Sequence, residues 1–148
     1  MAGIIIIVAI VDQLTKIAIL GSMAPGEIRP LIGDWFRFYL VFNSGAAFSM
    51  GAGFTWVFTL IQLAFVIVIA IYSPRITDTW SAVALALVAG GAAGNLIDRL
   101  FRAPGFFIGH VVDFISVGSF AIFNIADSCI TIGVCLLIIN LLGVKKNA

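Results

Sequence analysis

The sequence predicts a mainly α-helical, polytopic membrane protein with four membrane-spanning helices. Of its 148 residues, 62% are hydrophobic and 10% are charged, whereas a soluble domain has roughly 45 to 50% apolar and about 25% charged residues. The hydrophobic residues lie in four runs, each close to the ~20 residues that a helix needs to cross a bilayer. A formal net charge of +1 offers no basic field for nucleic acid. We therefore expect one membrane domain with no nucleic-acid partner.

The first predicted span covers residues 3 to 20, GIIIIVAIVDQLTKIAIL. A cleaved signal peptide is the competing interpretation, but Asp12 and Lys16 interrupt the run and no basic residue precedes it. These two residues are spaced i,i+4, so together with Thr15 they share one helix face that can offset the cost of burying charge. We interpret Asp12 and Lys16 as a helix-packing ion pair that supports a site.

The first outer loop, residues 21 to 53, is expected to contain a small extramembrane sheet. Its segment DWFRFYLVFNSGAAFS, residues 34 to 49, is aromatic and β-prone, and aromatic rings suit the headgroup level of a membrane. Asn43, Ser44 and Gly45 then interrupt the strand pattern. Polar and flexible residues so close to a membrane suggest that a polar group docks there.

The second and third predicted spans cover residues 54 to 72 and 81 to 101. Because only eight residues separate them, the two helices should be antiparallel neighbours. Gly90 and Gly94 have GxxxG spacing, which lets another helix approach closely.

Three polar residues follow those glycines near the end of the third span. Asn95, Asp98 and Arg99 are spaced i, i+3 and i+4, so they share a helix face. We interpret Asp98 and Arg99 in the first instance as an interfacial charge pair rather than as catalysts.

A second outer loop, residues 102 to 120, precedes the last predicted span, residues 121 to 142. Its alternating pattern predicts a short strand or extended hairpin. A single helix over residues 110 to 140 would be about 46 Å long, well beyond a hydrocarbon core of ~30 Å. Asp113 should therefore lie on a returning segment and Asp127 on the helix, so that the two can approach each other.

Four alternating spans place both termini on an inner side and both long loops on an outer side, and the buried polar groups then all fall in the outer half. The sequence thus predicts one site near the outer surface. Two carboxylates held close together cannot both ionise, so Asp113 and Asp127 can divide the roles of acid and base in hydrolysis.

A metal or cofactor is not expected at this site. His110 is the only histidine, and no cluster of His, Cys and Glu accompanies it. The two cysteines, Cys129 and Cys135, are six apart in one apolar segment, and we interpret them as ordinary buried thiols.

Three other functions remain open from the residues alone. A hydroxyl nucleophile, Ser44 or Ser49, with Lys16 as base would also give a hydrolase. A small proton-coupled transporter would use Asp12 or Asp127, although the sequence has neither an internal repeat nor polar groups through the midplane. A structural assembly factor would not need so many polar groups in the outer half.

Five motifs together resemble one family, lipoprotein signal peptidase or signal peptidase II, the membrane aspartyl protease of bacteria. Each motif is weak alone, but they occur in order from the first predicted span to the fourth and so cover most of the chain. They are VDQLTK at 11 to 16, NSGAAFS at 43 to 49, GNLIDR at 94 to 99, VVDF at 111 to 114 and FNIADS at 123 to 128.

This resemblance implies an endopeptidase that removes signal peptides from diacylglyceryl-modified prolipoproteins by cutting before the lipidated cysteine. It implies the bacterial inner membrane, a site near the extracytoplasmic face beside a β-like cradle, contact with membrane lipid, and action as a monomer. The orientation rests on the resemblance, because basic residues are equally frequent on both sides. Asp113 and Asp127 would be the catalytic pair. The supporting residues would be Asp12, Lys16, Asn43, Gly45, Asn95, Asp98, Arg99 and Asn124.

Overall fold

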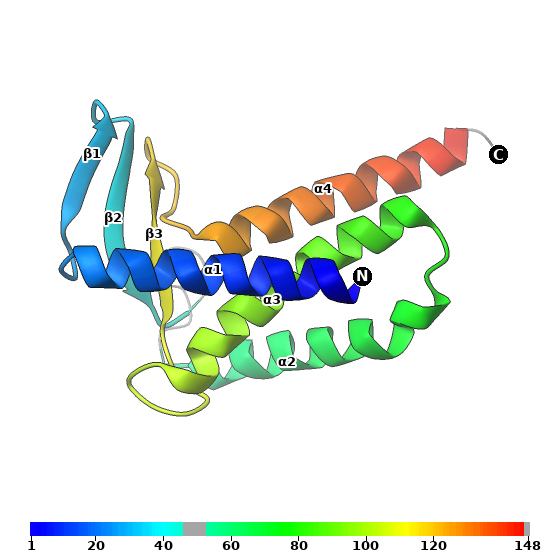
Figure 1. Ribbon diagram of the computed structural model, residues 1–148, viewed down its shortest axis with the longest axis horizontal. Coiled ribbons are helices and arrows are strands. Elements are labelled where there is room, and N and C mark those ends of the chain that lie inside the picture. Colours follow the sequence, from blue (N-terminus) through cyan, green and yellow to red (C-terminus); the bar gives the residue numbers. More distant parts are fainter. Residues whose placement is uncertain (46–52, 147–148) are drawn as a thin grey trace.

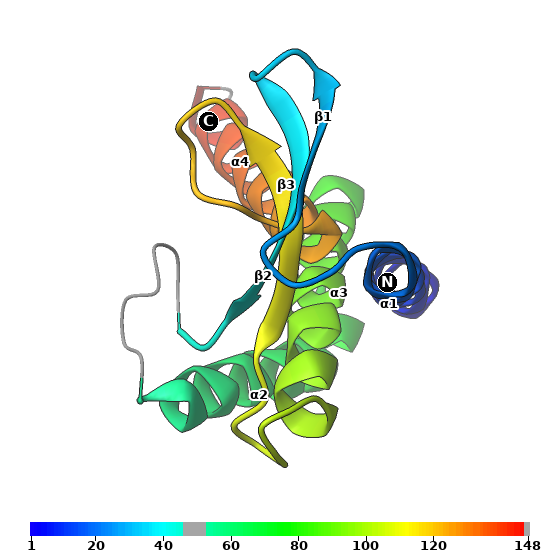
Figure 2. The same ribbon diagram turned by 90° about the vertical axis from the view of Figure 1, so that its left-hand side faces the viewer.

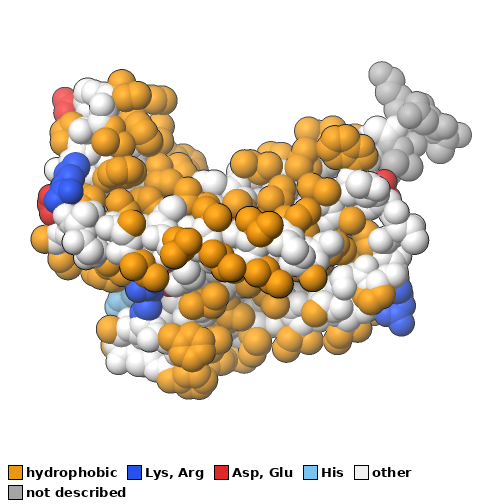
Figure 3. Space-filling model, viewed as in Figure 1, with side chains coloured by type: hydrophobic (Ala, Val, Ile, Leu, Met, Phe, Trp, Pro, Cys, Tyr) orange, Lys and Arg blue, Asp and Glu red, His pale blue; other side chains and the backbone are white. Residues whose placement is uncertain are grey.

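The computed structural model describes residues 1–45 and 53–146. Four long helices run back and forth: α1 (Ala2–Ser22), α2 (Thr55–Tyr72), α3 (Thr79–Phe101) and α4 (Ile125–Lys146), with a short 3₁₀ helix, η2 (Ser73–Arg75), between α2 and α3. In Figure 1 both chain ends lie away from the sheet. All four helices are long and apolar enough to cross a membrane. Figure 3 shows hydrophobic side chains over most of the visible face and charged ones near its two ends. The predicted four-helix membrane fold is confirmed.

Helix α3 is the centre of the bundle. More than half of its span is buried (56%), against 11 to 22% for the other three helices. Small residues permit this packing, because a Cβ atom added at Gly90 would lie 2.7 Å from Cβ of Val8 on α1. The close approach predicted from the GxxxG spacing therefore occurs between α3 and α1. Gly133 plays the same part between α4 and α3, where a Cβ atom would lie 2.6 Å from the backbone oxygen of Ala84.

The outer loops form one antiparallel sheet at one end of the bundle, with strand order β1 (Ile28–Ile32), β2 (Phe36–Asn43) and β3 (Val111–Val117). Figure 2 shows β2 between the other two strands. The register sets Asp113 opposite Val41. Behind the sheet, Leu40, Val112 and Phe114 form a small hydrophobic core with the last turn of α1. The expected cradle is therefore present and is anchored to the bundle.

Helix α4 begins at Ile125, four residues later than the residue 121 that the pattern indicated. The reason is a backbone interaction: Phe123 pairs with Ile115 of β3 in an isolated bridge. Its amide donates to the Ile115 carbonyl at 3.0 Å, and its carbonyl accepts from Ile115 at 2.8 Å. The chain therefore stays extended beside β3 until it reaches Asn124.

The prediction that both cysteines are buried is wrong. Cys129 is half-buried and Cys135 is exposed, and both are free thiols. Only one face of α4 packs against α3. An apolar residue such as Cys135 can therefore lie on the other face of the helix, outside the bundle.

Candidate active site

A cavity of about 670 Å³ lies between α2, α4 and the sheet, at the end of the bundle that carries the outer loops. Both acids of the predicted pair line it. The polar residues Asn43, Asn95 and Arg99 line it as well, and the remainder of its wall is mainly apolar. The structure therefore brings together residues from the sheet and from three helices.

Asp113 is supplied by β3 and is 2% exposed. Its Oδ2 accepts a hydrogen bond from Asn43 Nδ2 at 3.0 Å, and its Oδ1 accepts one from Asn124 Nδ2 at 2.7 Å. Burial, and then the negative charge of Asp127, raise the pKa of Asp113 to about 7, although these hydrogen bonds oppose the shift. Near neutral pH this carboxyl can hold or release a proton.

Asp127 is supplied by the first turn of α4 and is half-buried. Its backbone N–H donates to Asn124 Oδ1 at 2.9 Å, and its own Oδ2 accepts from the Asn124 backbone N–H at 3.3 Å. This reciprocal pair has the form of a capping box, which fixes where the helix begins. A third hydrogen bond, from Asn95 Nδ2 to Asp127 Oδ1 at 2.8 Å, fixes the carboxylate from α3.

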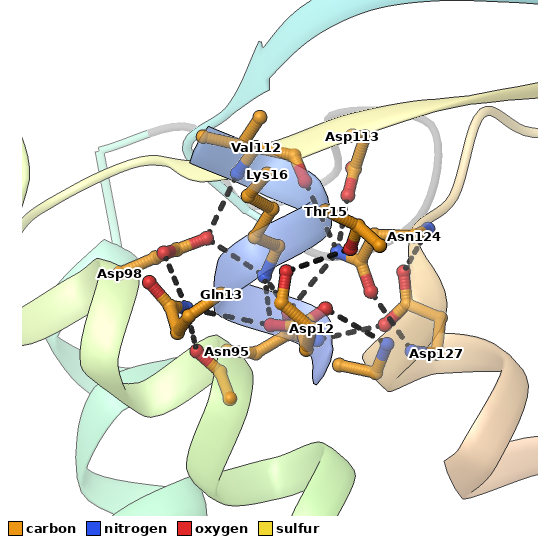
Figure 4. A network of polar contacts seen from close by, with 12 residues as sticks. Asp12, Gln13, Thr15, Lys16, Asn95, Asp98, Val112, Asp113, Asn124 and Asp127 are labelled. Atoms are coloured by element: carbon orange, nitrogen blue, oxygen red, sulfur yellow. Dashed lines mark hydrogen bonds and ion pairs between the residues drawn. The ribbon is translucent and has the colours of Figure 1, made fainter. Parts of the chain in front are cut away.

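Asn124 joins the two acids. The side-chain oxygen of Asn124 caps the helix that carries Asp127, and the side-chain NH₂ of Asn124 donates to Asp113 at 2.7 Å. Figure 4 shows the two carboxylates on either side of this residue. The geometry of the turn between β3 and α4 therefore depends on one fully buried amide.

A buried ion cluster lies behind the pair. Lys16 has no exposed surface, and its Nζ lies 2.7 Å from Asp12 Oδ2 and 2.8 Å from Asp98 Oδ2. It also donates to Asn95 Oδ1 at 2.9 Å. The other oxygen of Asp12 accepts from the backbone N–H of Ala126 at 2.9 Å. The cluster therefore ties α1 and α3 to the first turn of α4.

The polar face of α1 differs from the prediction in one residue. Thr15 donates only to backbone carbonyls of its own helix, at Val11 and Asp12, so it does not offset the buried charge. Gln13 takes part instead: its Nε2 donates to Asp98 Oδ1 at 3.0 Å, and its Oε1 accepts from Arg102 at 3.2 Å. The sequence signal for Gln13 is its position three residues before Lys16, on the same helix face.

The interpretation of Asp98 and Arg99 as an interfacial charge pair is wrong, because both are buried and they have different partners. Asp98 pairs with Lys16, accepts from Arg102 Nε at 2.6 Å and accepts from the Val112 backbone N–H at 3.1 Å. Arg99 instead lines the cavity and donates from Nη2 to the Gly45 carbonyl at 2.6 Å.

The serine and lysine alternative finds no support in the described residues. The Lys16 ammonium is occupied by two carboxylates and an amide, and Ser44 accepts through its backbone carbonyl from Thr55. Ser49, with residues 46 to 48 of the NSGAAFS motif, lies outside the described residues. Within the part of the chain that is described, no group of three or more His, Cys, Asp or Glu residues could hold a metal ion.

Comparison with known proteins gives one consistent result. The model of the signal peptidase II family matches residues 4–143. The lipoprotein signal peptidase of Mycobacterium avium is 48% identical over 86% of this chain and 70% of its own length. The lipoprotein signal peptidase of Rhodococcus jostii is 47% identical over 95% of this chain and 72% of its own length.

Two solved structures, each described as a bacterial membrane enzyme, have the same fold. One, at 2.3 Å resolution, has a TM-score of 0.85 and 37% identity, and the match covers 97% of this chain and 88% of the other. The second, at 1.9 Å, has a TM-score of 0.78 and 37% identity, with coverages of 94% and 90%. These matches give no support to a transporter. With the family model matching nearly the whole sequence, the chain belongs to the signal peptidase II family.

Proposed function

We propose that the chain is an aspartic endopeptidase in which Asp113 and Asp127 are the catalytic pair. The observation that carries the proposal is the single side chain of Asn124, which is hydrogen-bonded to one acid and caps the helix of the other in one cavity. Its substrates are prolipoproteins that carry a diacylglyceryl cysteine, and the cut falls just before that residue. No metal or other cofactor takes part.

The two acids have different roles in this proposal. Asp113 holds the proton, because burial and the neighbouring charge favour its neutral form, and Asp127 is the ionised base. Asp127 takes a proton from water as the water oxygen attacks the scissile carbonyl carbon, while Asp113 donates its proton to the carbonyl oxygen. When the tetrahedral intermediate collapses, the C–N bond breaks, Asp127 gives its proton to the leaving amine, and a hydroxyl proton returns to Asp113.

The other predicted residues serve the pair in two ways. Three that border the cavity, Asn43, Gly45 and Arg99, hold the substrate backbone or the lipidated residue. The others, of which Asn95 also borders the cavity and the rest lie behind it, position the carboxylates through hydrogen bonds and ion pairs, as the partners of Lys16 do. This group consists of Asp12, Lys16, Asn95, Asp98 and Asn124.

The enzyme works in the bacterial inner membrane with its cavity towards the extracytoplasmic face. The support is the separation of the sheet from the chain ends in Figure 1 and the position of the cavity beside the sheet. The signal helix of the substrate then lies among the four helices while the acyl chains stay in the bilayer. The proposed active form is a monomer.

The test is cleavage of a synthetic diacylated precursor by purified protein in lipid. Asp113→Asn and Asp127→Asn should each abolish cleavage while the protein remains inserted and melts cooperatively. Appreciable turnover by either variant would contradict the catalytic pair. Ser44→Ala and Ser49→Ala should keep full activity, and a precursor without the lipid should be a poor substrate.

A further inference from the structure

Three buried side-chain atoms lack a hydrogen-bond partner among the described residues, and all three belong to residues that line the cavity. They are Oε1 of Gln62 and the Nε and Nη1 atoms of Arg99. The fully buried charged and amide side chains behind the cavity, such as Lys16 and Asn124, are paired. A buried polar atom without a partner costs about 1 to 3 kcal/mol, so a native structure that keeps one calls for an explanation.

Gln62 is the less expected of the two residues. It is the only amide or charged side chain in α2, a span whose mean hydropathy is 2.2. It lies one turn beyond Phe58, on the same helix face, and the Phe58 ring centroid is 5.6 Å from Cζ of Arg99. No hydrogen bond joins the Gln62 amide to another described residue. Nothing in the catalytic proposal uses this side chain.

The atoms without partners form a complementary set. Arg99 offers two N–H donors and Gln62 offers an amide oxygen, and a peptide backbone presents carbonyl acceptors and N–H donors in alternation. We infer that Gln62 accepts a hydrogen bond from a backbone N–H of the substrate's signal segment, on the amino side of the scissile bond, while Arg99 donates to a substrate carbonyl. This inference rests on the proposed function, since it places the substrate in the cavity.

The helix geometry indicates which substrate residue is involved. Gln62 lies four positions after Phe58 in α2, which is about 6 Å along the axis, whereas a peptide that is extended next to the cut advances ~3.3 Å per residue. Helix α2 starts near the sheet and runs away from it in Figure 1, so Gln62 lies deeper in the bundle than Arg99's neighbour Phe58. The substrate residue whose N–H binds Gln62 therefore lies about two positions before the residue whose carbonyl binds Arg99.

An ester scan of the substrate tests this contact. In a series of diacylated precursor peptides, each amide upstream of the cut is replaced in turn by an ester, which removes one N–H donor. The wild-type enzyme should lose roughly 3- to 10-fold in kcat/KM at one position, as expected for one hydrogen bond. Gln62→Met should have a lower kcat/KM than the wild type on the all-amide peptide. The ester at that one position should not lower its kcat/KM further, while esters at the other positions act as they do on the wild type. The control Leu60→Met, which places the same side chain on the exposed face of α2, should keep the wild-type pattern.

The outcomes separate the two proposals. If the wild type cleaves the peptide but Gln62→Met shows the same ester profile, the Gln62 contact is overturned while the proposed function stands. If the wild type does not cleave the lipidated peptide, the proposed function fails and the contact fails with it. Thermal melting gives a second check: Gln62→Met should melt no lower than the wild type, since the replaced amide has no described partner. A clear decrease would mean that Gln62 is structural and would overturn the inference.

Discussion

Lys16 Nζ lies 2.9 Å from the side-chain oxygen of Asn95, and this contact, with a second one from Asn124 Nδ2 at 3.0 Å, fixes which end of the amide faces the cavity. An ammonium group only donates, so the Asn95 oxygen must face Lys16 and its NH₂ must face outward. That NH₂ donates to Asp127 at 2.8 Å. A buried cation on α1 thereby helps to orient the amide that is hydrogen-bonded to the Asp127 carboxylate of α4.

The first prediction separates the two effects of this lysine. Lys16→Met should reduce the free energy of unfolding by about 3 to 5 kcal/mol, because it leaves the Asp12 carboxylate buried without its cation. Asp98 keeps Arg102. Adding Asp12→Asn should restore most of that stability but only part of the cleavage rate, because the Asn95 oxygen then keeps Asn124 Nδ2 as its one donor. Melting temperature and cleavage rate measure the two effects. A double variant that remains as unstable as Lys16→Met alone would contradict the assignment.

The second prediction concerns the pH profile of cleavage. If Asp113 is the acid, kcat/KM should fall as the pH rises through about 7, where its carboxyl ionises. The Asn43 amide stabilises the ionised form of Asp113, so Asn43→Ala should raise the pKa and move the alkaline limb to higher pH. Asn140→Ala is the control, because Asn140 bonds to Asp78 and Ser81 outside the cavity. An alkaline limb that stays in place in Asn43→Ala would rule out this role for Asp113.

The third prediction concerns stability. The folded state holds the Asp113 pKa at about 7, above the ordinary 3.8, so between these values the folded chain binds more protons than the unfolded chain. Its stability therefore decreases as the pH rises through this window, by about 4 kcal/mol at most. Asp113→Asn removes this dependence. The melting temperature of Asp113→Asn minus that of the wild type should be more positive at pH 8 than at pH 4. An equal difference at the two pH values would refute the raised pKa of Asp113.

The spans and the acidic pair could be predicted because their signals are local. Four apolar runs stand out from composition alone, and a carboxylate such as Asp127 stands out against an apolar helix. The strand that carries Asp113 was also indicated by alternation and by the length limit on a helix.

The details that were missed depend on distant partners. The role of Gln13 depends on its hydrogen bond to Asp98, which is 85 positions away in the sequence. Asp98 and Arg99 were expected at an interface, but α1, the loop at Gly45 and β3 cover the end of α3. The later start of α4 follows from a backbone bridge to β3, and side-chain periodicity carries no information about such a bridge.

The last prediction tests the close approach of α1 and α3 at the ion cluster. A Cβ atom at Gly94 would lie 2.6 Å from Oδ2 of Asp12 and 3.0 Å from its Cγ. The carboxylate cannot move away freely, because Lys16 and the Ala126 backbone N–H hold its two oxygens. Gly94→Ala should therefore cost about 1 to 3 kcal/mol of stability, and it should also slow cleavage by displacing the first turn of α4.

Gly143→Ala is the matched control for this substitution. Gly143 also lies in a membrane-spanning helix, but a Cβ atom there would meet nothing within 4 Å. Because alanine favours a helix more than glycine does, this variant should melt at or above the wild-type temperature and cleave normally. If the two variants melt alike, Asp12 has room to move, and the first turn of α4 does not depend on the position of its carboxylate.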